Sequence, residues 1–494
     1  MQIRKTSLFL TLFLFFSIPL NAMKTLASYK KGNVYDVIIV GGGIAGLTAA
    51  FYLSDYSVLL LEKEKQAGGR ATSGKYKGLS YAKGPEYLGH PENPLKEIIA
   101  DLHLNLREIP SPADVISYGG KMFFGDLGKT QLLIKESSRG EFNRFVTKVL
   151  SEYKNYDDIP DLELSGERQR LDTITAKQWF DENHFSPIYY DIYNVAFRGL
   201  FGASADEISA LSALPEMAFE FEGFEPIEDD EDPTEGVSIS HNSTGMYSFE
   251  HGIAEIPLAL AKFLGDKLQT ETVVTDVRRA GELFEVNCRR ADNSTVTYMA
   301  DAVILATPSV VTLDIAREIL DKEQAKLLDS VNYSPYATVA LFTEEPIFNQ
   351  GFDLSVPDGL IFTDIYDATW VSRKHDIKPS SQKNWITLIY ASPASYLDTT
   401  FLKIPATELM KTIFEQLDNV LPGSSALVKD WKITQFQYGY PVMLPGSYQR
   451  MSRLEKITGN GLFLAGDYLI YPTFEAAASS GQLAAEKVID WLED

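Results

Sequence analysis

Apolar and polar positions near the start of the chain follow the pattern of a β-α-β unit. Residues 35–40 form an apolar run rich in Val and Ile and bounded by glycines, which is typical of a buried parallel strand. Residues 47–53 carry small and apolar side chains at helical spacing, and residues 57–61 form a second buried run. We therefore expect strand, helix and strand over residues 34–62.

Later parts of the chain divide into two interleaved sets of elements. Strand-like runs recur at residues 272–277, 284–289, 302–306 and 461–467, and the last of these precedes a helical pattern that runs to Trp491. Between them, residues 109–240 are largely helix-patterned, whereas residues 311–456 combine strand-like runs at 338–342 and 385–390 with a helix near 407–420. A chain of 494 residues is too long for one ordinary core. We expect an α/β protein with two intertwined domains.

The N-terminus has the order of a secretory signal. Arg4 and Lys5 precede an apolar run, and small residues follow at Ala22 and Ala27. The apolar segment is shorter than the roughly 20 residues that a membrane span needs. We expect residues 1–27 to be a signal peptide and the protein to be exported, periplasmic or secreted, with no membrane span in the mature chain. An uncleaved N-terminal anchor is the alternative.

Charge and cysteine content exclude several classes of protein. The formal net charge of −23 argues against nucleic-acid binding, which needs a basic face, and favours attraction of cationic substrates. Cys288 is the only cysteine, and the six histidines show no metal-ligand spacing, so no metal site is expected. The nine acids within residues 220–235 are typical of a solvated loop, or of a segment that steers a cationic substrate.

Three glycines follow the first strand with the spacing G-x-G-x-x-G. Gly41 allows a sharp turn, Gly43 lets the backbone approach a pyrophosphate, and Gly46 lets the helix pack closely on the strand. The backbone N–H groups of Ile44 and Ala45 then lie at the N-terminus of the helix, which favours an anion. The pattern predicts dinucleotide binding, and the alternative is an ordinary tight turn between strand and helix.

The residues after the second strand extend this prediction. Glu62 is placed to accept hydrogen bonds from ribose hydroxyls. Lys63 follows it, and Gly68, Gly69 and Arg70 come a few residues later. Two glycines and an arginine so close to the ribose acid predict a loop across the pyrophosphate, whose charge the guanidinium would balance.

At these residues the chain resembles the flavin-containing amine oxidase superfamily. That superfamily includes monoamine and polyamine oxidases, L-amino-acid oxidases, protoporphyrinogen oxidase and phytoene-type desaturases. Its members share the dinucleotide glycines, the ribose glutamate and a G-G-R-x-x-[ST] continuation, here residues 68–73. The resemblance implies a Rossmann-like FAD-binding domain of the GR2 type, interleaved with an α+β substrate-binding domain, and an FAD-dependent oxidase or dehydrogenase.

The resemblance also implies domain boundaries. The FAD-binding domain is expected from residues 34–108, 241–310 and 457–494, and the substrate domain from residues 109–240 and 311–456. Residues 202–211 look like the helical stretch at which the family's substrate domain folds back.

Further cofactor contacts follow from the resemblance alone. The segment Gly84, Pro85 and Glu86 looks like the one that passes the isoalloxazine ring. The backbone of Val274 would contact the adenine. A C-terminal strand ends in a Gly-Asp pair, and a helix opens shortly after it; the candidate residues there are Gly466, Asp467, Thr473, Phe474 and Glu475. The N-terminus of that helix would stabilise the negative N1/O2 edge of reduced flavin.

Two departures from the family concern the reaction itself. Many amine oxidases carry a lysine near flavin N5, and that position falls here on Thr338, in a stretch without lysine between Lys326 and Lys374. Of the two tyrosines that flank the flavin in monoamine oxidases, one position falls on Thr473 and the other near Tyr440. No cysteine is present there, so FAD should be bound noncovalently.

Candidate catalytic residues and three functions follow from these comparisons. Thr338, Tyr440 and Tyr87 are the candidates for the reacting side of the flavin, with Tyr438 and Phe474 as further pocket aromatics. The first function is oxidation of a C–N bond in a small amine or amino acid, with dioxygen or another acceptor reoxidising the flavin. The second is oxidation of an apolar substrate, as in protoporphyrinogen oxidases and desaturases, which lack the lysine. The third is a non-catalytic flavin-bound protein.

Overall fold

The structure is a computed structural model that describes residues 34–154, 164–221, 226–227, 244–375, 383–457 and 459–493. The expected signal segment 1–27 and most of the acidic stretch 220–235 lie outside these ranges. Over the described ranges, every helix is too short or too polar to cross a membrane. The mixed α/β fold class is confirmed, while the exact domain boundaries stay predictions.

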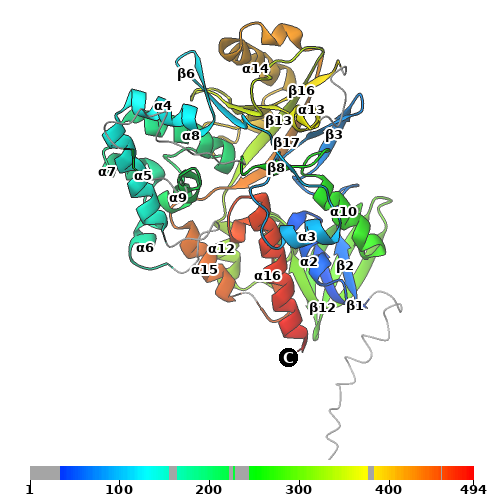
Figure 1. The fold of residues 1–494 in the computed structure, drawn as a ribbon. Coiled ribbons are helices and arrows are strands. Elements are labelled where there is room, and N and C mark those ends of the chain that lie inside the picture. The colour runs from blue at the N-terminus through cyan, green and yellow to red at the C-terminus, as the bar shows by residue number, and fades with distance from the viewer. Residues whose placement is uncertain are drawn as a thin grey trace, which may run out of the picture.

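The first large sheet gathers strands from three distant parts of the chain (Figure 1). Its order is β10–β11–β12–β1–β2–β9, and β18 also pairs with β12. The strands are β1 (Val34–Val40), β2 (Val58–Leu61), β9 (Leu268–Gln269), β10 (Thr272–Ala280), β11 (Leu283–Arg290), β12 (Thr295–Leu305) and β18 (Leu462–Leu464). The central strands run parallel and are buried, which explains their continuous apolar runs. The hairpin β10–β11 extends the sheet in antiparallel fashion.

Helices from both ends of the chain pack together beside this sheet. Helix α2 (Ile44–Tyr52) follows β1, and α16 (Phe474–Glu493) crosses it closely (Figure 1). A Cβ atom added to Gly481 of α16 would lie 2.1 Å from the carbonyl oxygen of Ala45 in α2. This crossing therefore needs glycine, and it fixes the C-terminal helix against the first β-α unit.

The second large sheet belongs to the other half of the molecule. Its order is β17–β13–β16–β15–β14–β6–β7. The strands are β6 (Asp114–Tyr118), β7 (Lys121–Phe124), β13 (Tyr333–Thr343), β14 (Asp353–Ser355), β15 (Phe362–Asp367), β16 (Trp385–Ala391) and β17 (Asp430–Pro441). Helix α14 (Ala406–Val420) covers one face through an apolar cluster. The expectation of a largely helical block over residues 109–240 missed β6 and β7, which join strands from the later block.

A helical block flanks the second sheet. It consists of α4 (Gly125–Glu136), α5 (Arg139–Tyr153), α6 (Gly166–Thr173), α7 (Ala176–Glu182), α8 (Pro187–Phe201) and α9 (Ala210–Phe219). Buried aromatic rings such as Phe145, Trp179 and Tyr189 form its core. Residues 202–209 form turns between α8 and α9, so the expectation of a helix there was wrong. Gly202 ends α8 in the left-handed conformation, which stops the helix at this point.

Replacing Gly481 tests the crossing of α2 and α16. Gly481→Ala is expected to lower the free energy of unfolding by about 1–3 kcal/mol, because the added Cβ overpacks the contact with Ala45. Gly140→Ala is the matched control in helix α5, because an added Cβ there meets nothing within 4 Å. Chemical denaturation compares the two, and equal losses in both variants would contradict the proposed crossing.

Candidate active site

The glycine loop between β1 and α2 leaves an open cradle at the start of the helix. Gly41 has φ +108, and an added Cβ would lie 2.4 Å from the Ala306 carbonyl oxygen. A Cβ on Gly46 would lie 2.0 Å from the Gly41 carbonyl oxygen, whereas one on Gly43 would meet nothing within 4 Å. Gly43 is the N-cap of α2 and no side chain caps the helix, so its first N–H groups face this open space.

Glu62 is fixed beside this cradle by backbone donors. The Gly42 N–H donates to Glu62 Oε2 and the Glu64 N–H donates to Oε1, both at 2.7 Å. Burial, which leaves Glu62 6% exposed, raises the pKa of its carboxyl group, and the backbone bonds oppose that shift. A carboxylate has further lone pairs, so these bonds still leave room for ribose hydroxyls. Lys63 is exposed beside Glu64, and Val274 is buried on β10.

The second predicted loop and the C-terminal Gly-Asp pair meet across the structure. The guanidinium of Arg70 forms an ion pair with Asp467 at 2.7 Å and donates to the Gly439 carbonyl oxygen at 2.7 Å. The Gly68 N–H donates to the Gly42 carbonyl oxygen, which joins the two glycine loops. The fold thus brings together residues that the sequence assigned separately to one cofactor.

The start of α16 completes this group. Thr473 caps the helix, because its hydroxyl oxygen accepts from the Ala476 N–H at 3.2 Å. Glu475 accepts from the Gly89 N–H at 3.2 Å and so ties the helix to the segment after Tyr87. The helix begins at Phe474, as the sequence predicted. Its N-terminal turn therefore lies beside the segment that the resemblance places along the flavin ring.

The segment from Lys83 to Glu86 is held by the second sheet. Thr338 donates its hydroxyl hydrogen to the Lys83 carbonyl oxygen at 3.0 Å, and Tyr390 donates to the Gly84 carbonyl oxygen at 2.6 Å. A Cβ on Gly84 would lie 2.3 Å from the Arg70 carbonyl oxygen, so the two cofactor segments touch. Thr338 therefore supports the backbone of the predicted flavin-contacting segment.

Aromatic side chains line the same face of the second sheet. Tyr336 lies 5.4 Å from Tyr390 and 5.2 Å from Tyr440 between ring centroids. The Tyr440 hydroxyl donates to the Gly199 carbonyl oxygen at 2.7 Å. Tyr87 packs near Phe352 at 6.3 Å, within the same cluster. Two of the predicted pocket aromatics, Tyr87 and Tyr440, thus share one apolar cluster.

The other two predicted aromatics lie elsewhere. The ring of Tyr438 contacts Tyr333, with 5.3 Å between centroids. Phe474 packs against the core of the nucleotide-binding sheet and its helices. Strand alternation places Tyr438 and Tyr440 on the same face, so the sequence alone could not separate them. The register shift of β17 between its pairings with Ser334 and Tyr336 gives the two tyrosines different surroundings.

Three aspartates continue this face, and the sequence reasoning missed them. Asp353 of β14 is paired in register with Asp114 of β6, and Asp364 of β15 is paired with both Ser355 and Tyr390. Desolvation, together with repulsion from neighbouring acids, raises the pKa of Asp114 to about 7, although its side chain is exposed. Burial likewise raises the pKa of Asp364 to about 6 and that of Asp353 well above its ordinary value. The sequence does contain a signal for these aspartates, because each is an acid inside a strand.

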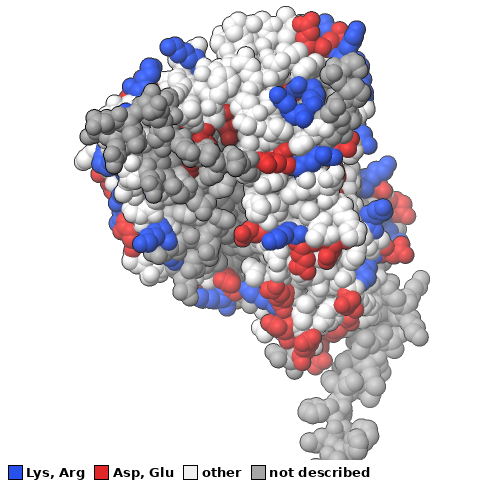
Figure 2. Space-filling view, in the orientation of Figure 1, with Lys and Arg blue, Asp and Glu red and all other residues white. Residues whose placement is uncertain are grey.

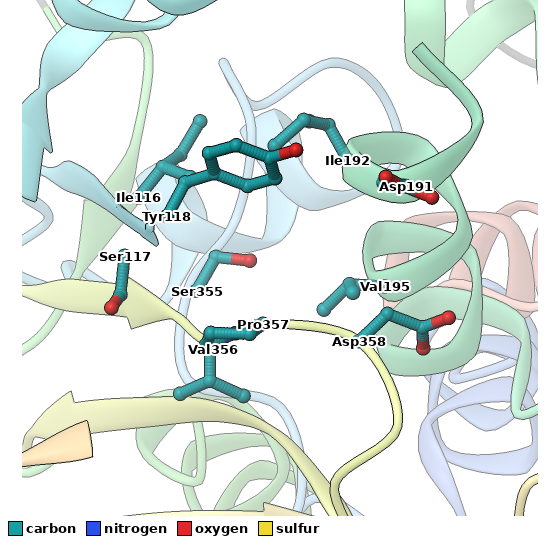
Figure 3. Close-up of a pocket in the computed structure, with 10 residues that line it drawn as sticks. All are labelled: Ile116, Ser117, Tyr118, Asp191, Ile192, Val195, Ser355, Val356, Pro357 and Asp358. Atoms are coloured by element: carbon teal, nitrogen blue, oxygen red, sulfur yellow. The ribbon is translucent and has the colours of Figure 1, made fainter. Parts of the chain in front are cut away.

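A pocket of about 300 Å³ lies at the far end of these strands, between β6, α8 and the turn after β14 (Figure 3). Tyr118 and Ile192 lie on one side of the hollow, and Ser355, Val356 and Pro357 on the other. Its two acids differ in their partners. Asp358 pairs with Arg198 at 3.1 Å, whereas the pKa of Asp191 is raised by burial and by the nearby Asp358. Acidic side chains are also recessed beneath the outer surface in Figure 2.

These features combine an open glycine cradle beside a carboxylate with an acid-lined face of the second sheet, an arrangement typical of an oxidoreductase with a bound cofactor. A profile of the family described as flavin containing amine oxidoreductase matches residues 44–489. The chain therefore belongs to the flavin-containing amine oxidoreductase family, and it is a flavin-dependent enzyme of that family.

Individual relatives are distant. The chain is 27% identical over 293 residues to an L-amino acid dehydrogenase of Synechocystis sp., covering 55% of this chain and 56% of the relative. It is 25% identical to a flavin-containing amine oxidase of Oncorhynchus mykiss, covering 56% and 50% of the two chains. The matches thus span about half the length of these relatives. A triple mutant of putrescine oxidase has the same fold, with a TM-score of 0.72, 18% identity and coverage of 93% and 99%.

The cradle at Gly43 and the carboxylate of Glu62 are expected to hold the cofactor. Gly43→Trp fills the open space, and Glu62→Ala removes an acceptor, so both variants should purify without the visible absorbance of flavin. Glu64→Ala is the control, because that side chain is 68% exposed. Absorbance spectra of the purified proteins, together with circular dichroism to verify folding, provide the measurement. A folded variant that keeps its full flavin content would remove this assignment.

Buried carboxyl groups are expected to make stability fall as pH rises. Burial raises the pKa of Glu86 from 4.5 to about 8, so between these values the folded state holds a proton that the unfolded state releases. The free energy of unfolding therefore decreases over this interval, and Glu86→Gln should make the decrease shallower. Denaturation midpoints measured from pH about 5 to about 8 test this, with the exposed Glu64→Gln as control. Parallel curves for Glu86→Gln and the original protein would contradict it.

Proposed function

We propose that the protein is an FAD-dependent oxidase that removes a hydride from the carbon next to nitrogen in a small amine or amino acid. The observation that carries the proposal is the acidic face formed by Asp114, Asp353 and Asp364. Like charges directly opposite each other on neighbouring strands destabilise a protein. A cationic substrate between them would relieve this repulsion, which gives the arrangement a physical purpose.

The residues present fit noncovalent FAD. Glu62 would hold the adenosine ribose, the N-terminus of α2 and Arg70 would hold the pyrophosphate, and residues 84–86 would run along the isoalloxazine ring. Cys288 is buried on β11 in the first sheet, away from the Tyr440 region, which supports noncovalent binding. When bound, FAD supplies the hydride acceptor, and dioxygen is the proposed final oxidant.

The side chains of the second sheet would bind and orient the substrate. The carboxylates would attract an ammonium group, and charge-assisted hydrogen bonds to them would fix its position. Tyr336, Tyr390 and Tyr440 would form an apolar wall that excludes water from the reacting carbon. The N-terminal pattern supports export as part of this proposal.

Thr338 favours a second candidate, an oxidase or desaturase for an apolar substrate. Its hydroxyl is bound to the Lys83 carbonyl oxygen, so the lysine-dependent arrangement of many amine oxidases is replaced here by a backbone support. Against this candidate, an apolar ligand would cover three carboxyl groups without giving them hydrogen bonds, which is costly. We therefore place amine oxidation first.

A substrate screen with charge variants tests the proposal. Peroxide release is expected with members of a panel of amines and amino acids. Asp353→Asn and Asp364→Asn should raise KM for the active cationic substrate about 10–100-fold, because a hydrogen bond to a charged group contributes about 1.5–3 kcal/mol. Asp266→Asn, exposed on the 3-10 turn at Gly265–Lys267, is the control.

The same variants separate binding from folding. Each asparagine should leave thermal stability unchanged or raise it, because it relieves repulsion in the free protein. Silence across the amine panel, combined with flavin bleaching by a polyene or porphyrinogen, would overturn the first candidate in favour of the second.

A further inference from the structure

Glu86 is a buried acid on the segment expected to pass the flavin, and the proposed function gives its carboxyl group no role. It is 8% exposed, and the Ser248 hydroxyl donates to its backbone carbonyl oxygen at 2.9 Å, which holds the segment in place. The charged group that acts on it is another acid, Asp367. Asp367 is itself paired with Arg373 of helix α13 (Trp370–Lys374). Within the ranges that the structure describes, Glu86 therefore has no ion pair with a cation.

The hydrogen bonds around Tyr390 indicate which form of Glu86 the structure holds. The Tyr390 hydroxyl oxygen lies 2.6 Å from the Gly84 carbonyl oxygen and 3.1 Å from Glu86 Oε1. A carbonyl oxygen can only accept, so the single tyrosine hydrogen is best placed on the shorter bond to Gly84. The longer contact is then satisfied when Glu86 is protonated and donates to the tyrosine oxygen. The hydrogen-bond geometry therefore favours a protonated, neutral Glu86 carboxyl group.

We propose that Glu86 accepts the proton of the substrate's ammonium group before the amine is oxidised. This inference rests on the proposed function. The ionised carboxylate takes H⁺ from R₂CH–NH₃⁺, which leaves R₂CH–NH₂ and a neutral Glu86 that donates to Tyr390. The neutral amine can then lose a hydride, with two electrons, from the carbon next to nitrogen and become the iminium ion R₂C=NH₂⁺; FAD, when bound, would accept that hydride. Glu86 returns its proton to solvent before the next cycle.

Neighbouring groups on the same face are already committed or poorly suited to this role. Thr338 donates to the Lys83 carbonyl oxygen and Tyr440 donates to the Gly199 carbonyl oxygen. Burial raises the pKa values of Tyr336 and Tyr366 well above that of an ordinary tyrosine, so neither ionises near neutrality. The chain also has no lysine between Lys326 and Lys374, the stretch that contains Thr338. The carboxyl group of Glu86 lies within hydrogen-bond distance of this cluster of hydroxyls, 3.1 Å from that of Tyr390.

The titration of Glu86 supports this geometry. Burial is the main cause that raises its pKa to about 8; a hydrogen bond from the Tyr390 hydroxyl to the ionised carboxylate would oppose this rise, and repulsion from Asp367 adds to it. The groups that interact with it from the packed elements are Tyr390 on β16, Asp353 on β14 and Asp367 at the end of β15, and burial raises the pKa of each. A general base is most effective when its pKa lies near the working pH.

The kinetic test uses the flavin-loaded enzyme and the most active amine from the screen. For the original protein, kcat/KM should rise with pH through about 8, as the carboxylate forms. Glu86→Gln should remove this rise and lower kcat/KM about 10²-fold or more above it, within the range typical of general bases. Glu86→Asp, which keeps the carboxyl group, should restore part of the rise.

Glu216→Gln is a closely matched control. On α9, Glu216 Oε1 lies 3.0 Å from the Tyr471 hydroxyl oxygen, which also lies 2.7 Å from the Ser212 carbonyl oxygen. Burial raises the pKa of Glu216 to about 7. It thus repeats the chemistry of Glu86 away from residues 84–86. The midpoint of the alkaline rise should stay unchanged in Glu216→Gln.

A second measurement needs no turnover. Infrared difference spectra of the substrate-free protein should show a protonated carboxyl band that disappears as pH rises through about 8, that is absent in Glu86→Gln and that persists in Glu216→Gln. Calorimetric titration with an amine that has no hydrogen on the carbon next to nitrogen, in buffers of different ionisation enthalpy, counts protons. In the original protein, binding should release about one proton per ligand at pH 7 and none well above pH 8. Glu86→Gln should not show this release at pH 7.

The outcomes separate this inference from the function on which it rests. If amines are oxidised but Glu86→Gln keeps the alkaline rise and the proton count, the role of Glu86 is wrong and the proposed function stands. If the carboxyl band titrates as described but no amine is bound or oxidised, the proposed function falls, and the proton-accepting role falls with it.

Discussion

Close backbone contact at a few glycines is the constraint on which the rest of the structure depends. Gly41 and Gly46 let β1, α2 and the strand end at Ala306 approach within distances that no Cβ allows. Gly481 does the same where α16 crosses α2. These contacts bring the first and last parts of the chain together, so that residues predicted from distant motifs to hold the cofactor belong to one packed unit. The Arg70–Asp467 ion pair then joins the two predicted cofactor segments.

Repulsion between carboxyl groups is the main electrostatic feature of the second sheet. A sheet face that places Asp353 opposite Asp114 and adds Asp364 is unfavourable in the free protein. Such groups reduce their cost by binding protons, which is why their pKa values rise, or by binding a cation. The ammonium group of the proposed substrate would offer the second route. The same face would then become a source of affinity and of selection for charge.

Thr338 and Glu86 together give this region a structure and a titratable group that the absence of a lysine at position 338 does not reveal. A threonine at this position fixes the backbone at Lys83, and a tyrosine on the next strand fixes Gly84. The backbone that should carry the flavin ring is thus held by two hydroxyls of the second sheet. The buried carboxyl group beside them supplies a titratable site that the sequence motif assigned only to cofactor contact.

The sequence by itself determined the nucleotide-binding half. Its signals are local: glycines at fixed spacing, a strand ending in Glu62, and a helix start at Phe474, each of which depends on residues close together in the chain. It also determined the family, because those motifs occur in a fixed order.

Only the tertiary structure decided which side chains share the substrate face. Tyr440 and Tyr438 are two residues apart, yet Tyr440 contacts α8 whereas Tyr438 contacts Tyr333. The reason is the register shift of β17, which lies between its pairings with Ser334 and Tyr336. Asp114, Asp353 and Asp364 come from strands separated by long stretches of chain, and their proximity follows from strand pairing, which no local pattern records.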